Sequence, residues 1–196
     1  MSEKSSKKRL VLTISSLCVA VVAVVCSIVA IFAATSQSVK TTFKVTYSAT
    51  NVAATVSANY TVKNGTKKAL GKAITIKADD ADNTEYATLS STEDIALSTA
   101  NNEVVFEYIF KNDSEDKAFK VTLSDGANRD NVTVSYATTT TANAENLSYS
   151  STVPTDVDVA ASGTTYIYIK VEITNLANAA EYTSNDAKPI SWSLVA

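Results

Sequence analysis

The stretch that decides the fold is Val104-Val105-Phe106-Glu107-Tyr108-Ile109-Phe110, a run of β-branched and aromatic residues interrupted by one acid. Residues of these types fit the pleated, half-buried surface of a β-sheet. Because both faces of the run are apolar apart from Glu107, it predicts a strand at the centre of a sheet. The polar segment Asn112–Asp116 follows, and its side chains are of the kind that bond their own backbone in a turn.

Segments on both sides of this run alternate between apolar and polar residues, which is the period of a strand with one buried face. They cover residues 39–47, 54–62, 74–76, 119–123, 132–136, 157–159, 166–173 and 190–194, and Leu89, Ile95 and Leu97 suggest one or two further short, weaker strands. Turn residues such as Asn64-Gly65 separate several of them, and the aperiodic polar stretch over 137–152 predicts a long surface loop. The sequence therefore predicts an all-β domain over residues 39–196, folded as a two-sheet antiparallel β-sandwich of jelly-roll or immunoglobulin-like type.

Residues 1–36 have a different character. Four basic residues within the first nine precede an uncharged, mostly apolar run from Leu10 to Ala34. As a helix, residues 11–34 would extend about 36 Å, enough to cross roughly 30 Å of hydrocarbon. The segment predicts an N-terminal hydrophobic helix that acts as a signal peptide or as a signal anchor, that is, a transmembrane helix. Both alternatives stay open, because Ile31 or Phe32 places a bulky residue where a cleavage site prefers a small one.

The basic residues before the apolar run predict that the remainder faces away from the cytoplasm. We therefore expect an extracellular or cell-surface domain, attached to the membrane if the segment is retained. Residues 37–196 carry 13 bases and 19 acids, a net charge of −6. An acidic domain without a basic stripe does not have the composition of a nucleic-acid binder.

The chain contains no histidine, and its two cysteines both lie within the apolar run. Histidine is the usual base of nucleophilic triads, and zinc sites use histidine and cysteine. No glycine-rich phosphate loop occurs either. We therefore predict a non-catalytic protein.

Two groups of residues are candidates for binding. Asp79, Asp80 and Asp82 lie in one acidic loop and could supply oxygen ligands to Ca²⁺, the only cofactor that the sequence suggests, although a solvated turn explains the same residues. Tyr166 and Tyr168 share one face of a strand, where an exposed pair could contact a sugar or a protein partner. The alternative is that this face lies under a loop.

The strand–turn–strand pattern of residues 105–114 and 119–123, after a long export segment that leads directly into an alternating strand, resembles the TasA/camelysin group of exported Gram-positive proteins. The resemblance implies a jelly-roll β-sandwich, a signal removed by a dedicated signal peptidase, and assembly into biofilm-matrix fibres. Some camelysin-type proteins have been described as metalloproteases. This chain has neither histidine nor a His-Glu-x-x-His motif, so that activity is not expected here.

The leading hypothesis is a structural or matrix subunit of a bacterial cell surface, able to form homo-oligomers or fibres. In this hypothesis the strand over residues 39–47 adds to the sheet of a neighbouring copy, with Val39, Phe43, Val45 and Tyr47 filling pockets there. The alternative is a membrane-anchored extracellular module that binds a glycan or a protein.

Overall fold

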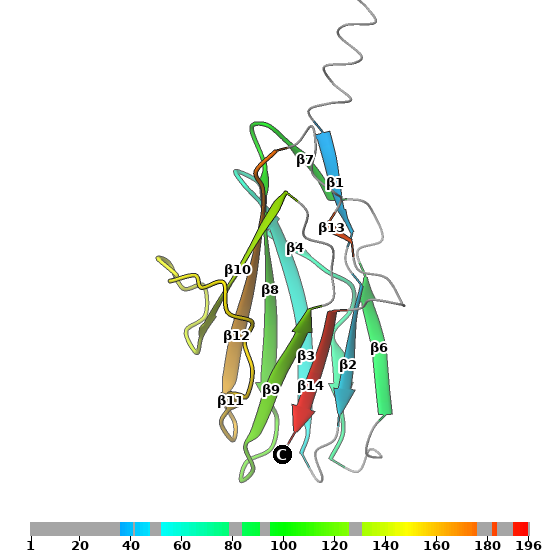
Figure 1. The fold of residues 1–196 in the computed structure, drawn as a ribbon. Helices are drawn as coiled ribbons and strands as arrows, with labels where there is room; N and C mark the ends of the chain where they lie inside the picture. The colour runs from blue at the N-terminus through cyan, green and yellow to red at the C-terminus, as the bar shows by residue number, and fades with distance from the viewer. Residues whose placement is uncertain are drawn as a thin grey trace, which may run out of the picture. The chain divides into compact units, whose positions relative to one another are not determined.

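A computed structural model describes residues 36–40, 42–47, 52–78, 84–90, 95–125, 131–175, 182–183 and 190–195 of the chain. The chain divides into two units, Met1–Ser36 and Gln37–Ala196, and the description that follows concerns the second. The described residues form β-strands and loops and include no helix (Figure 1). Among them there is consequently no helix that is long and apolar enough to cross a membrane.

The largest sheet has six strands and contains the apolar run from Val104 to Phe110. Its strands follow the order β10-β12-β8-β3-β4, and β5 pairs with β3 beside β4. Their bounds are Val132–Thr139 for β10, Thr164–Ile173 for β12, Glu103–Asn112 for β8, Ala54–Val62 for β3, Lys68–Ala69 for β4 and Ile74–Ile76 for β5. All the pairs are antiparallel, and β8 lies between β12 and β3. The prediction of a central strand over residues 104–110 is confirmed.

A second sheet has five strands in the order β11-β9-β14-β2-β6. Their bounds are Val157–Val159, Phe119–Asp125, Ile190–Val195, Thr42–Tyr47 and Thr84–Ser90, respectively. The pair β14–β2 is parallel, with Phe43 opposite Ile190, while the other pairs are antiparallel. A three-stranded sheet joins β13 (Tyr182–Thr183), β1 (Ser36–Lys40) and β7 (Ile95–Ser98), and its β1–β13 pair is also parallel.

One hydrophobic core takes side chains from both larger sheets. From β8 it receives Val104, Phe106, Tyr108 and Phe110, which are all fully buried. From the five-stranded sheet it receives Phe119, Val121, Leu123, Val159 and Leu194. Every second residue of β8, β12 and β9 lies in this core, as the period of two predicts. Burial of these side chains, at about 25 cal/mol per Å² of apolar surface, is the main force that holds the strands together.

Two expectations about strands need correction. The alternating stretch over residues 39–47 was predicted as one strand, but the structure has β1 and β2 in different sheets. The sheets were predicted to be antiparallel throughout, and the pairs β14–β2 and β1–β13 are exceptions. The predicted N-terminal helix lies outside the described residues.

Candidate functional site

A polar cluster surrounds Glu107, on the face of the six-stranded sheet opposite the core. Register places Tyr168 of β12, Glu107 of β8 and Asn59 of β3 side by side. Glu107 is only 4% exposed. Its carboxylate accepts hydrogen bonds from Asn59 Nδ2 at 2.8 Å and from the Tyr168 hydroxyl at 3.0 Å. Lys67 Nζ lies 2.9 Å from Glu107 Oε2 and completes the cluster.

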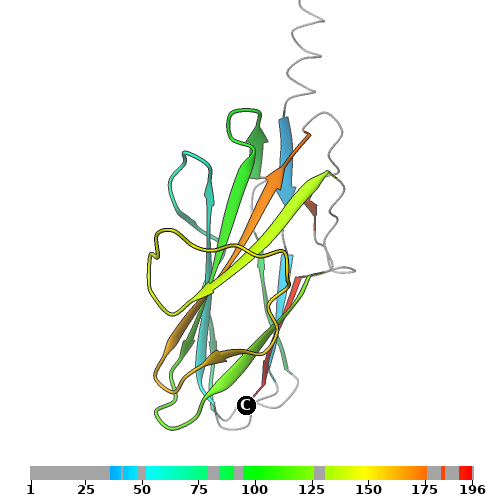
Figure 2. The same ribbon diagram turned by 60° about the vertical axis from the view of Figure 1, so that its left-hand side comes forward.

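Side chains of the 140–150 loop contact this face of the sheet. Asn143 accepts a hydrogen bond from Lys67 at 3.1 Å. Further along, Lys170 Nζ lies 4.7 Å from the centre of the Tyr149 ring, a cation–π contact. Figure 2 shows this segment in yellow, leaving β10 and returning toward β11. These contacts tie the loop to the sheet.

The electrostatics of the cluster favour an ionised Glu107. Burial raises the pKa of the Glu107 carboxyl, but the hydrogen bonds from Lys67, Asn59 and Tyr168, together with the charge of Lys67, hold its pKa below the ordinary value. Burial, and then the hydrogen bond to Glu107, raise the pKa of the Tyr168 hydroxyl. Glu107 is therefore a carboxylate and Tyr168 a neutral phenol at neutral pH, and both shifts move the pKa values away from the range near 7 that suits general acid–base catalysis.

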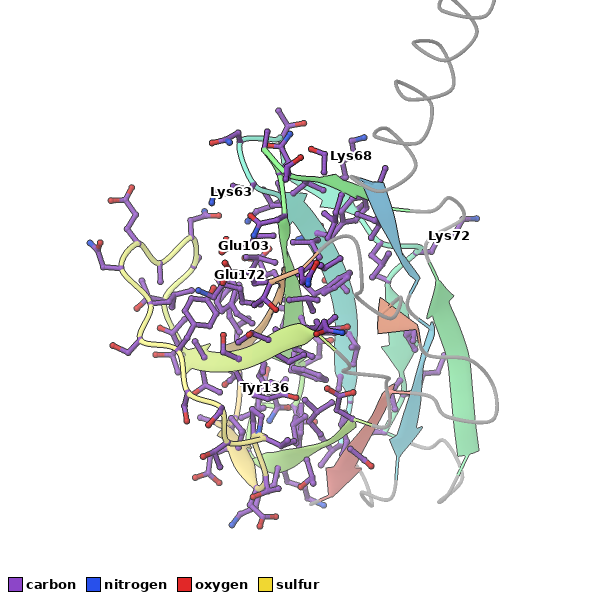
Figure 3. The ribbon with its side chains drawn as sticks, turned by 45° about the horizontal axis from the view of Figure 1, so that its top comes forward. Lys63, Lys68, Lys72, Glu103, Tyr136 and Glu172 are labelled. Carbon is purple, nitrogen blue, oxygen red and sulfur yellow. The ribbon has the colours of Figure 1, made fainter. Side chains whose placement is uncertain are left out.

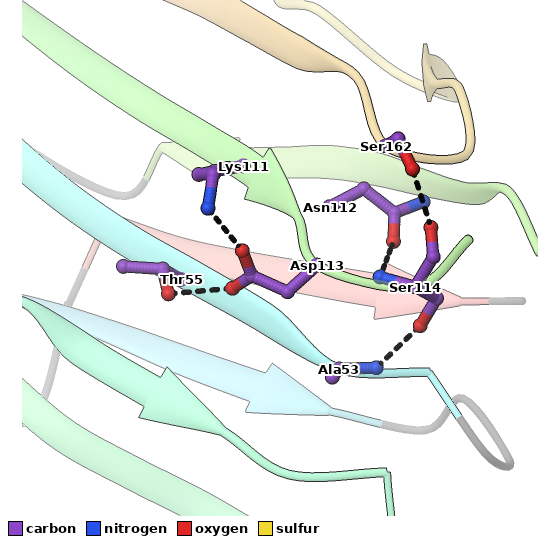
Figure 4. Close-up of polar contacts among 7 residues, drawn as sticks. All are labelled: Ala53, Thr55, Lys111, Asn112, Asp113, Ser114 and Ser162. Atoms are coloured by element: carbon purple, nitrogen blue, oxygen red, sulfur yellow. Dashed lines mark hydrogen bonds and ion pairs between the residues drawn. The ribbon is translucent and has the colours of Figure 1, made fainter.

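A second polar cluster closes the turn between β8 and β9 (Figure 4). Asn112 is 1% exposed, and its Nδ2 donates to the carbonyl of Lys117 at 2.7 Å and to that of Val159 at 3.3 Å. Its Oδ1 accepts from the backbone N–H of Ser114 at 3.0 Å. Asp113 bonds Lys111 and the Thr55 hydroxyl. The prediction that this turn is held by its own side chains is confirmed.

A groove of about 400 Å³ lies between β10 and the segment that leads to β11. Its hydroxyl-bearing rim consists of Thr138, Ser148, Ser150, Thr152 and Thr155, all exposed. Its remaining lining consists of Tyr136, Ala137, Val153, Pro154 and Val157. We call this feature the β10 groove. No charged side chain is among these lining residues.

The tyrosine pair does not offer two exposed rings. Tyr168 is 6% exposed and is held by Glu107, so it has no free ring face for a ligand in this structure. Tyr166 is half-buried, and its role as a contact residue stays a prediction.

The other predicted site residues are less fully described. Asp79, Asp80 and Asp82 lie outside the described residues, so the calcium prediction is untested. Within the described part of the chain, no group of three or more His, Cys, Asp or Glu residues is arranged to hold a metal ion. Val39 lies in β1, while Phe43, Val45 and Tyr47 lie in β2, between β14 and β6.

Sequence reasoning missed Lys67, Asn59 and Asn143. The one available signal was Glu107 itself, because a single acid inside an apolar central strand requires polar partners. No known protein family, curated protein or solved structure matches this chain.

Proposed function

We propose that the protein is a non-catalytic, exported β-sandwich that serves as a structural subunit of a bacterial cell surface and self-associates by strand exchange. The basic, then apolar, first 36 residues support export. The common core between the two larger sheets supports the sandwich. The ionised Glu107 cluster, which ties a loop to a sheet, supports a structural role over a catalytic one.

The observation that carries the proposal is the pairing of β2 with β14. Phe43 to Tyr47 pair in parallel with Ile190 to Leu194, so strands far apart in the sequence complete one sheet. A copy of β2 from another chain presents the same backbone groups to β14 and to β6. When two chains exchange β2, each copy of the strand makes the same contacts that it makes within the monomer, and the two chains become linked.

The test uses cysteines across this pair. Thr46 and Ser193 are register partners, and adjacent strands about 4.8 Å apart are within disulfide range. Both populations of the chain carry Cys18→Ser and Cys26→Ser. The isotope-labelled population also carries Thr46→Cys, and the unlabelled population carries Ser193→Cys. The two populations are then unfolded, mixed and allowed to assemble. We expect a disulfide between labelled and unlabelled chains at these positions, detected by mass spectrometry of peptides.

Two controls define the result. The double variant in a single chain must form the bond within the monomer, which verifies the register. The combination of Thr133→Cys with Ser193→Cys joins strands of different sheets and should yield no specific bond. Fibres without the mixed disulfide, or a chain that stays monomeric at high concentration, would contradict strand exchange.

A further inference from the structure

We infer that the β10 groove is a binding site for a neutral saccharide. This inference goes beyond self-association and does not depend on the exchange of β2. It rests on three properties of the groove, namely its hydroxyl-rich and uncharged lining, its fixed walls, and the absence of backbone groups for an added peptide strand at its centre.

The residues that line the groove favour a neutral ligand that carries hydroxyl groups. Five serine and threonine hydroxyls border the groove, and each can both donate and accept a hydrogen bond. A saccharide presents hydroxyls of the same dual character. The lining contains no lysine or arginine to bind an anionic sugar and no carboxylate to bind a cation. Val153, Pro154 and Val157 add apolar surface against which the C–H groups of a sugar ring can lie.

The walls are held in place before any ligand arrives. Ser150 and Tyr136 exchange two backbone hydrogen bonds, of 2.7 and 2.8 Å, which fix the segment to β10. Pro154 O accepts from the N–H of Leu123 at 3.0 Å, and the N–H of Asp156 donates to the Thr122 hydroxyl at 3.1 Å, which fixes the same segment to β9. A preformed site avoids part of the ordering cost of binding.

The same backbone bonds argue against a peptide as the ligand. An extended peptide gains affinity mainly by pairing with the free edge of a strand. At the centre of the groove that edge of β10 is already occupied, because the N–H and C=O of Tyr136 both bond Ser150. At the centre of the groove, recognition therefore falls to side-chain hydroxyls. The Tyr136 ring is 1% exposed and offers no stacking face, so the affinity should be weak, with a Kd of about 1 mM.

The test is saturation-transfer NMR on the full chain in a zwitterionic detergent without a sugar headgroup. The probes are maltose, cellobiose and N,N′-diacetylchitobiose, with glucuronic acid as the anionic comparison. We expect saturable transfer to at least one neutral disaccharide and none to glucuronic acid. In the triple variant Thr138→Val, Thr152→Val and Thr155→Val, which keeps side-chain shape but removes three hydroxyls, the Kd should rise about tenfold or more.

The matched control is Thr66→Val, Thr75→Val and Thr133→Val, three exposed threonines outside the groove. Unchanged binding in this control and loss in the groove variant would support the site. Equal loss in both variants, preference for the anionic sugar, or no saturable transfer up to about 10 mM of any neutral disaccharide would overturn it.

Discussion

At the scale of single residues, Glu107 is the one acid that is buried among the residues whose burial the structure describes. It is nearly fully buried and receives three side-chain donors, two of them from other strands of its sheet and one from Lys67. An unpaired charge there would be strongly destabilising. The sequence indicates that a buried acid in need of polar partners lies at this position, since Glu107 interrupts an apolar strand. It does not reveal the partners, because Lys67 and Asn143 come from loops whose paths depend on the whole fold.

The pH dependence of stability tests the Glu107 cluster. The pKa of this carboxyl is lower in the folded protein than its ordinary value of 4.5, so its contribution is present above about pH 4.5 and is lost as the pH falls through the folded pKa. Glu107→Gln keeps the size and removes the charge. We expect it to lower the free energy of unfolding by about 1–3 kcal/mol at pH 7 and by less at pH 3, measured by urea unfolding.

The control for this experiment is Glu115→Gln, which changes an exposed acid in the β8–β9 turn. It should leave the free energy of unfolding within about 0.5 kcal/mol of the original at both pH values. If Glu107→Gln lowers the free energy of unfolding by as much at pH 3 as at pH 7, the carboxylate charge is not what stabilises the cluster.

Asn112 supports a second prediction at this scale. In Asn112→Asp, a carboxylate oxygen replaces the amide nitrogen that faces the carbonyls of Lys117 and Val159. We expect a loss of about 3 kcal/mol or more at pH 7, because a buried charge then opposes two acceptors. Protonation restores one donor, so the loss should be smaller at pH 3, as chemical denaturation will report.

Asn146→Asp is the same change at an exposed asparagine. It should be nearly neutral in stability. Equal losses for the two substitutions would contradict the assigned role of the Asn112 side chain.

At the scale of elements, the positions of most strands follow from the sequence. Alternation predicts β3, β9 and β12, because each has one face in the core, and the continuous run of β-branched and aromatic residues predicts β8. The two-residue strand β4 was missed, since so short a segment has no period to detect. The parallel pairing of β2 with β14 was missed as well, because alternation describes the faces of a strand and says nothing about its neighbours.

The outer strand β4 supplies a prediction about sheet edges. Lys68 lies in this strand and Lys72 just after it; both are exposed, and neither forms an ion pair with a described carboxylate (Figure 3). Lysines on a short edge strand discourage pairing with other sheets. The variant Lys68→Thr with Lys72→Thr should aggregate several times faster, measured by light scattering.

Lys117→Thr with Lys120→Thr removes the same charge from the β8–β9 turn and from β9, where Lys120 forms a surface ion pair with Asp158, and serves as the control. Similar aggregation rates for the two double variants would mean that net charge, and not protection of the β4 edge, sets solubility.

At the scale of the whole molecule, the fold class was predictable and its topology was not. The all-β character of the described residues follows from composition and alternation. The order of strands in each sheet depends on contacts between distant segments, such as Val121 with Leu194 across β9 and β14. Pairings of this kind arise from the combined burial of many side chains, which no single stretch of sequence encodes.

The pairing of β2 with β14 also determines when the five-stranded sheet can be completed. If the chain is exported with its N-terminus first, as we propose, β2 emerges well before β14. The five-stranded sheet cannot acquire its central strand β14 until residue 195 has emerged. During that interval one side of β2 waits for a partner. The crowding of emerging chains would then decide whether β14 arrives from the same molecule or from its neighbour.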